Sequence, residues 1–274
     1  MNINQHKFGV MILNKVEKAN IEPRITLIGA GPGDPDLFSL KGVKALKTAD
    51  VVLYDANVNE ALLCHAPDGI PKVYVGKRSD DEDFSQEAVN KLIVDYALNY
   101  GHVVRLKSGD PFFFAKGYEE IDAAESYSIP TEIIPGISSA TGAPSLQKIP
   151  MIYKDLSESF WAVTGTNSRG EISEDLYIAA KTKATIVVLN GIEKVKEIAA
   201  IFQAESKNLL PVAVIQNGST PQEKIAVGIV DTIAEIVEDK KIIAPALLVF
   251  GDVVSLHPQF QPIRDFYETL AEEY

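Results

Sequence analysis

The first half of the chain alternates short apolar runs with longer amphipathic stretches from Ile25 onward. Short runs rich in β-branched residues and leucine, bounded by glycine, proline or polar residues, are typical of buried strands. Strands alternating with helices predict a mostly parallel sheet that is covered on both faces. The predicted strands are ITLIG at 25–29, VVLY at 51–54, VYV at 73–75, VVRL at 103–106 and a strand ending in EIIP at 132–135.

The clearest helix is predicted over residues 86–100, where apolar residues recur at three- and four-residue spacing along one face. Asp83 and Gln86 fit a capping box at its start, because an acceptor is followed three residues later by an amide side chain. Gly101 is expected to end the helix.

The second half of the chain repeats this alternation. Pro144 and Pro150 interrupt a weakly periodic stretch over 143–155, which we interpret as the crossing between two domains. A turn at 217–221 precedes 224–230 and predicts that this strand is antiparallel. The other predicted strands are 160–165, 184–189, 212–216 and 246–251. The sequence therefore predicts an α/β fold with three parts: an N-terminal extension over 1–20, a first α/β domain over 21–145 and a second over 146–274.

Charge and composition narrow the function. The net charge of −12 over 274 residues argues against general binding to nucleic acid or to anionic membranes, since both need a basic surface. The short apolar run near the N-terminus is too short to span a bilayer. The single cysteine, Cys64, suits a reducing compartment, so we expect a cytoplasmic protein. The four histidines are scattered without ligand spacing, and no metal site is predicted.

A glycine-rich turn, GAGPGDPDL, follows the first predicted strand at 29–37. Such turns let backbone approach a ligand closely at the carboxyl edge of a sheet. A dinucleotide site is disfavoured, because Gly29, Gly31 and Gly33 alternate and Pro32 and Pro35 prevent the immediate helix start that the dinucleotide motif needs. A tight turn without a ligand stays open as the alternative.

Two further loops follow predicted strands. In SGDPFFF at 108–114, three successive phenylalanines cannot all face one core, so at least one is expected to line a pocket; three partly buried rings in a lid loop are the alternative. In PGISSATGAPS at 135–145, Ser138 and Ser139 stand where a helix would begin, and their hydroxyls either cap that helix or bind a polar ligand. All three loops lie at carboxyl ends of predicted parallel strands, where open α/β sheets bind ligands.

With these loops in this order, the chain resembles the tetrapyrrole methylase family from about residue 25 to residue 256. The strings that carry the resemblance are ITLIGAGPGDPDLFSLKGVKALKTADVVLYD, VGKR, VVRLKSGDPF, PGISSATGAP and VTGT. The resemblance implies two α/β domains with a ligand cleft between them, S-adenosylmethionine as cofactor with S-adenosylhomocysteine as product, and a homodimer.

The resemblance also implies roles for individual residues. Asp55 and Lys77 match the family's proton acceptor and donor. The plain alternatives are helix capping or a turn for Asp55 and a solvated lysine for Lys77. The candidates for charge-assisted contacts to a polycarboxylate tetrapyrrole are Lys77, Arg78, Arg105, Lys107, Lys116 and Lys154. The residues that match cofactor contacts are Pro32, Ser108, Gly109, Asp110, Phe113, Ser138, Ser139, Asn190 and Gly218.

The chain departs from the family pattern mainly where the tetrapyrrole should lie. Lys116 replaces an arginine, Asn190 replaces a methionine, Asp83-Phe84 replaces a His-Ser pair, and Pro150–Lys154 replaces Pro-Leu-Thr-His-Arg; on the cofactor side Ser108 replaces a glycine. The cofactor is therefore predicted more firmly than the substrate.

The expected reaction is methylation of uroporphyrinogen III at two ring carbons to give precorrin-2, which leads to sirohaem or cobalamin. Three alternatives stay open. They are a methylase of this fold acting on another corrin precursor or on a protein residue, as diphthine synthase does; a non-catalytic module that binds S-adenosylmethionine; and, more remotely, a nicotinamide dehydrogenase.

Overall fold

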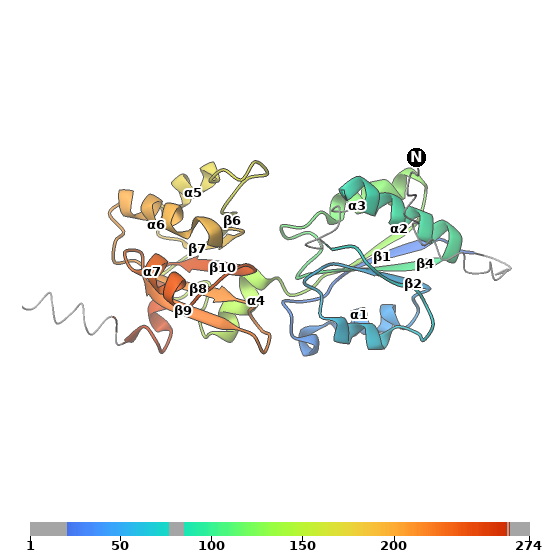
Figure 1. Ribbon diagram of the computed structural model, residues 1–274, viewed down its shortest axis with the longest axis horizontal. Helices are drawn as coiled ribbons and strands as arrows, with labels where there is room; N and C mark the ends of the chain where they lie inside the picture. Colours follow the sequence, from blue (N-terminus) through green and yellow to red (C-terminus); the bar gives the residue numbers. More distant parts are fainter. Residues whose placement is uncertain (1–20, 77–84, 262, 264–274) are drawn as a thin grey trace, which may run out of the picture.

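The computed structural model describes residues 21–76, 85–261 and 263. The predicted N-terminal extension, the capping residue Asp83, and the site residues Lys77 and Arg78 lie outside the described residues. Two α/β units lie side by side, joined by a narrow connection (Figure 1). The predicted fold class of two α/β domains is confirmed.

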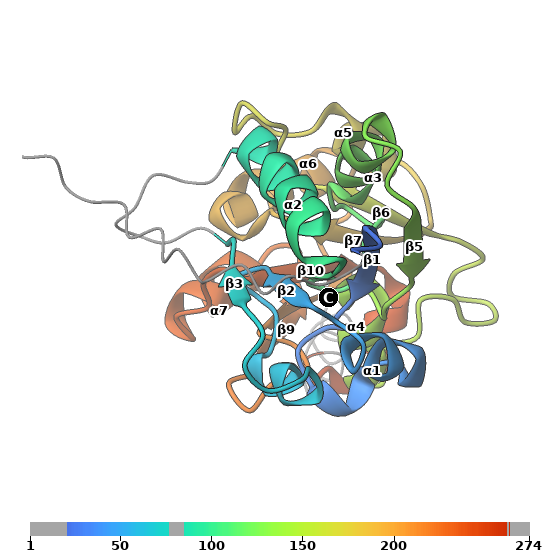
Figure 2. The ribbon, with the colours of Figure 1, turned by 90° about the vertical axis from the view of Figure 1, so that its right-hand side faces the viewer.

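The first unit is built on a fully parallel five-stranded sheet in the order β3-β2-β4-β1-β5. Figure 2 shows β3, β2, β1 and β5 across this sheet, with α2 and α3 over one face and α1 over the other. The strands are β1 (Arg24–Gly29), β2 (Val51–Tyr54), β3 (Lys72–Tyr74), β4 (His102–Lys107) and β5 (Thr131–Ile134). The helices are α1 (Leu40–Leu46), α2 (Gln86–Tyr100) and α3 (Gly117–Ser126), with short 3₁₀ turns at η1 (Pro35–Leu37) and η2 (Glu60–His65).

Alternation along the strands explains the two covered faces. Ile25 and Leu27 of β1 pack in a core with α2 and α3, whereas Ile28 packs in a second core with α1 and η2. Because successive residues of a strand point to opposite faces, strands that are covered on both sides are apolar throughout. The near-continuous apolar runs of the sequence reflect this packing.

The helix predicted over 86–100 is α2 with those bounds, and Gly101 ends it with a φ of 111°. Its cap differs from the prediction. The N-cap is Ser85, whose Oγ accepts a hydrogen bond from the Ala88 amide at 3.2 Å. Gln86 is the first residue of the helix and therefore cannot occupy the third helical position, which a capping box starting at Asp83 requires.

The second unit has a mixed five-stranded sheet in the order β6-β7-β10-β8-β9. β9 is antiparallel to β8, as predicted, and β10 also runs opposite to its neighbours β7 and β8. The strands are β6 (Phe160–Thr164), β7 (Thr185–Leu189), β8 (Pro211–Gln216), β9 (Lys224–Ile229) and β10 (Ala246–Phe250). The helices are α4 (Ser139–Leu146), α5 (Glu174–Ala179), α6 (Val195–Ala204) and α7 (Ile233–Asp239), with η3 (Ile192–Lys194) and η4 (Asp252–Leu256).

Helix α4 belongs by its packing to the second unit. Ala140 and Ala143 are buried in one core with Val187, Ala213 and Val249, which come from β7, β8 and β10. Figure 1 shows α4 on the inner side of the second unit, next to the connection. The sequence division at residue 145 assigns α4 to the first domain, whereas the packing places the passage between the two units at about residues 135–138.

Candidate functional site

Three loops of the first unit meet through glycines. A β-carbon added to Gly29, the last residue of β1, would lie 2.5 Å from the Gly109 carbonyl oxygen and 2.5 Å from the Gly136 Cα. No side chain tolerates such distances, so the loops after β1, β4 and β5 approach each other only because these residues are glycines. The sequence predicted that these loops share one sheet edge, and the structure brings them into contact.

Backbone hydrogen bonds connect the first two loops. The Gly31 amide donates to the Gly109 oxygen at 3.1 Å, and the Gly109 amide donates to the Gly31 oxygen at 2.8 Å. Both glycines have positive φ, 80° and 66°, a conformation that L side chains rarely adopt. These bonds fix the backbone directly before Pro32 and Asp110.

Asp110 connects the second loop to the third. Its Oδ1 accepts a hydrogen bond from the Phe112 amide at 2.9 Å, which closes a tight turn. Its Oδ2 accepts from the Gly136 amide at 3.1 Å. A single carboxylate therefore sets the shape of its own loop and holds the loop that leads into α4.

The two serines of the third loop have different positions. Ser138 is the N-cap of α4, and its Oγ accepts a hydrogen bond from the Ala140 amide at 3.2 Å. Ser139 is the first residue of the helix. Capping, one of the two readings of this pair, thus accounts for Ser138, while the hydroxyls of both serines still reach the cleft described next.

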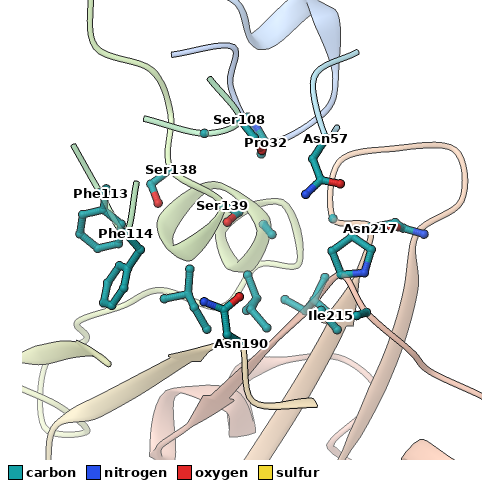
Figure 3. Close-up of a pocket in the computed structure, with 18 of the residues that line it drawn as sticks. Pro32, Asn57, Ser108, Phe113, Phe114, Ser138, Ser139, Asn190, Ile215 and Asn217 are labelled. Carbon is teal, nitrogen blue, oxygen red and sulfur yellow. The ribbon is translucent and has the colours of Figure 1, made fainter. Parts of the chain in front are cut away.

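A cleft of about 350 Å³ lies between the two units. Figure 3 shows the side chains that surround it, with Phe113 and Phe114 on one side, Asn57 and Asn217 on the other, and Asn190 rising from the second sheet. All nine residues that the sequence matched to cofactor contacts line this cleft: Pro32, Ser108, Gly109, Asp110, Phe113, Ser138, Ser139, Asn190 and Gly218.

Several lining residues were missed by sequence reasoning. Asn57 and Asn217 contribute side chains, and residues 244–247 add a stretch at the start of β10. Phe113 and Phe114 both line the cleft, which meets the expectation that at least one of the three successive phenylalanines would do so. Asn190 and Asn217 directly follow β7 and β8 with φ of 52° and 50°. A lone asparagine after an apolar strand is the signal that could have found Asn217, because asparagine adopts this left-handed conformation more readily than other residues.

The lining combines apolar and polar groups. Ala143, Leu189, Ile215 and Leu247 form an apolar floor from the second unit, while hydroxyl and amide groups surround it. A site of this size and character suits a small molecule with a flat apolar part and several polar atoms. Gly218 lets the turn after β8 pack closely on α4, because an added β-carbon would lie 2.5 Å from that of Ala143.

The two units also contact each other beside the cleft. The Asp34 amide donates a hydrogen bond to the Ser219 Oγ at 3.0 Å, which joins the first loop to the turn between β8 and β9. Phe113 packs against the core of the second unit, and its ring lies 5.1 Å from that of Phe114. Loops of the first unit and strands of the second therefore form the walls of one cavity.

Asp55 lies at the edge of this site, directly after β2. It is level with Lys107, because its amide bonds to the Leu106 oxygen across the β2–β4 pair. Its carboxylate accepts a short hydrogen bond from Arg105, and its side chain is 29% exposed. Asp55 is near Ser108 of the cleft but is not itself part of the lining.

The predicted substrate-contacting cations have different settings. Lys116 and Lys154 are exposed. Lys107 and Arg105 are buried, and Lys107 pairs with the buried Glu120 at 2.7 Å. This setting differs from the open contact to a substrate carboxylate that the sequence suggested. The reason is that both residues lie within β4, a central strand covered on both faces.

Among the described residues, no group of three or more histidine, cysteine, aspartate or glutamate side chains could hold a metal ion. In the same part of the chain, every helix is too short or too polar to cross a membrane.

Comparison with known proteins agrees with this fold. The sequence model of the protein family described as tetrapyrrole (corrin/porphyrin) methylases matches residues 24–234. The chain therefore belongs to the tetrapyrrole methylases. It is 37% identical to a uroporphyrinogen-III C-methyltransferase of Methanocaldococcus jannaschii over 235 residues, which are 85% of this chain and 97% of that protein.

Two other similarities extend the picture. A siroheme synthase of Nitrosomonas europaea is 36% identical over 85% of this chain, which spans only 49% of that longer protein. A crystal structure of a Thermus thermophilus uroporphyrin-III C-methyltransferase in complex with S-adenosylhomocysteine has a TM-score of 0.73 and 35% identity. It covers 85% of this chain and 99% of its own.

Proposed function

We propose that this protein transfers methyl groups from S-adenosylmethionine to two ring carbons of uroporphyrinogen III and so forms precorrin-2. One observation carries the proposal: nine residues from separate family motifs line a single cleft between the two units. Two relatives that match 85% of this chain and are named uroporphyrinogen-III C-methyltransferase support it.

The cleft residues fit the cofactor. S-adenosylmethionine supplies an electrophilic methyl group on a sulfonium. The apolar floor with Ile215 and Leu247 suits its adenine ring, and the amides of Asn190 and Asn217 suit its polar atoms. Asp110 shapes the loop that passes over this region. The role of these residues is to hold donor and acceptor at attack distance and to exclude water, which provides most of the acceleration in such a displacement.

For the tetrapyrrole, we propose contacts from the rim of the cleft. Lys116 follows the Phe113–Phe114 loop and is exposed, as is Lys154. Both can reach substrate carboxylates through charge-assisted hydrogen bonds. Lys77 and Arg78 are proposed for the same surface from the family match alone. Asp55 is proposed as the acceptor of the proton that leaves the macrocycle, and Lys77 as the proton donor; general acid–base help of this kind contributes about 10²–10⁴ in rate.

The proposal is tested by incubating the purified protein with S-adenosylmethionine and uroporphyrinogen III and following the product by mass spectrometry. Addition of two methyl groups is expected. The control is the same incubation with later corrin precursors. Methylation of those precursors alone would contradict the proposed substrate and favour the alternative of a later corrin precursor. That alternative is supported by Lys116 and Asn190, which stand where the family has an arginine and a methionine.

We further propose that the protein is a cytoplasmic homodimer. The edge strand β6 and helix α5 expose large apolar side chains, and Phe160, Trp161 and Ile178 line a shared hollow. Contiguous apolar surface on an otherwise acidic protein is typical of an interface. The single cysteine, Cys64, is free and exposed, which suits a reducing compartment.

A further inference from the structure

Beneath the cleft, four charged side chains form one cluster. Arg105 and Lys107 project from β4 toward Glu120 of α3 and Asp55 after β2. Lys107 Nζ lies 2.7 Å from Glu120 Oε1, and Arg105 lies 3.3 Å from the same oxygen. Arg105 also donates to Asp55 Oδ1, and Lys107 Nζ is 4.0 Å from Asp55 Oδ2. Two positive and two negative charges are therefore balanced within one contact network.

Burial gives this network a direction. The Glu120 side chain is fully buried, those of Arg105 and Lys107 are 3% and 5% exposed, and that of Asp55 is 29% exposed. The charges thus run from a sealed end at α3 to an open end beside the cleft. Lys107 is followed by Ser108, which lines the cleft, so the same cluster lies under the cleft wall.

A buried cluster of charges contributes little to the free energy of unfolding. Buried ion pairs lose hydration that their attraction rarely repays in full, and apolar residues of similar volume often stabilise a core as well or better. Glu120 adds a further cost to folding, because its Oε2 is buried without a hydrogen-bond partner. The presence of a fully buried carboxylate with one unpaired oxygen therefore needs an explanation other than stability. Its two partners, Arg105 and Lys107, also contact Asp55.

The two carboxylate oxygens of Asp55 have different contacts. Oδ1 is held by Arg105, whereas Oδ2 has no donor within hydrogen-bonding distance among the described residues. Glu120 Oε1 in turn holds both cations in place. The arrangement fixes the plane of the Asp55 carboxylate and leaves one oxygen available.

We propose that Glu120 is a positioning residue that acts through Arg105 and Lys107 to aim Asp55 Oδ2 at the proton leaving the methylated macrocycle. This inference rests on the proposed function. In the step concerned, the C–H bond of the substrate breaks, its electron pair stays with the macrocycle, and the proton adds to Oδ2 while Oδ1 remains bonded to Arg105.

The test is a double-mutant cycle with Glu120→Gln and Asp55→Asn. Glu120→Gln keeps the shape of the side chain and removes its charge. It is expected to lower kcat by about 10- to 100-fold, the range for a misplaced catalytic group, with little change in KM or in the affinity for S-adenosylhomocysteine. The double variant is expected to be no slower than Asp55→Asn alone, because both changes remove the same action. Glu238→Gln, the same change at an exposed ion pair, is the matched control.

Three results would overturn the inference: wild-type kcat in Glu120→Gln, losses that multiply in the double variant, or loss of cofactor affinity in parallel with kcat. If Glu120→Gln does not fold, Arg105→Lys replaces it, since it keeps the charge and loses the forked geometry; the same kcat loss and the same non-additivity are expected. A wild-type protein that does not methylate uroporphyrinogen III refutes the proposed function itself, before any variant is compared.

Discussion

Asp110 and Gly136 are joined by a hydrogen bond from the Gly136 amide to the Asp110 carboxylate at 3.1 Å. The two residues come from loops after different strands, and Gly136 precedes the helix that carries Ser138 and Ser139. The shape of the cleft wall therefore depends on a contact between loops as well as on the side chains that face the cleft.

The first prediction concerns this contact. Asp110→Ala is expected to weaken binding of S-adenosylhomocysteine by at least about tenfold, because both loops lose a charge-assisted bond and each such bond contributes about 1.5–3 kcal/mol. Isothermal titration calorimetry measures the effect. Asp110→Asn is the matched control, since its amide oxygen can still accept one of the two bonds and an intermediate loss is expected. Unchanged affinity in Asp110→Ala would show that the loop assignment is wrong.

The second prediction separates the backbone of Asn190 from its side chain. Asn190 has a φ of 52° and its amide faces the cleft. Asn190→Gly keeps this conformation accessible, whereas Asn190→Ala strains it by about 1–2 kcal/mol. Both variants are expected to bind the cofactor several-fold more weakly, and only the alanine variant should unfold at lower denaturant. Equal affinity of the glycine variant and the wild type would exclude a role for the amide.

The third prediction concerns pH and stability. Burial lowers the pKa of His102 below its ordinary value of 6.5, and the neighbouring Arg24 lowers it further. Burial also lowers the pKa of His257, together with Lys148 and Lys240, and its Nδ1 accepts a bond from the Gln259 amide that protonation would remove. Both groups are therefore protonated more readily in the unfolded chain than in the folded one.

As the pH falls through the unfolded pKa of histidine toward the lower folded values, the free energy of unfolding should decrease; above that range it should be constant with respect to these groups. Denaturant titrations between about pH 5.5 and 7.5 measure this slope. The double variant His102→Gln/His257→Gln should have a shallower slope than the wild type. Identical slopes would show that neither histidine titrates with folding.

The fourth prediction concerns the apolar face of β6 and α5. Trp161→Glu is expected to convert a dimer to a monomer in sedimentation analysis, since a carboxylate buried in an apolar interface loses its hydration without gaining a partner. Leu209→Glu is the control, because Leu209 is 59% exposed and lies outside this hollow. A wild-type protein that sediments as a monomer would contradict the dimer directly.

Much of this architecture was readable from the pattern of residues. Strands buried on both faces leave continuous apolar runs, so β1, β2 and β4 were predicted within one residue, and the regular apolar spacing gave α2 with its bounds. The convergence of Pro32, Asp110 and Ser138 followed from the rule that parallel strands end at one edge. Neither the reversal of β10 nor the side on which α4 packs has a local signal, because both depend on which distant strands lie beside them.

In the candidate site, too, features with a local sequence signal were predicted and features that depend on distant contacts were not. The loops were found because glycine reports close backbone approach, and the individual residues in them came from the family resemblance. Asn57 and the stretch at 244–247 have ordinary composition and became visible only in three dimensions. Arg105 and Lys107 show the opposite error of sequence reading. A charged residue in an apolar run can belong to solvent, to a ligand or to an internal partner, and only the position of Glu120 distinguishes these cases.

The placement of α4 has a consequence for any attempt to divide the protein. A fragment that ends at residue 145 would carry Ala140 and Ala143 away from the strands that bury them and leave a bare apolar surface on the other half. A fragment that begins near residue 136 would keep this helix on its sheet. The fragment that begins near residue 136 should give a cooperative melting curve, whereas separation at residue 145 should lead to aggregation. The two halves of the molecule can therefore be separated only at a point before α4, the helix that lines the cleft.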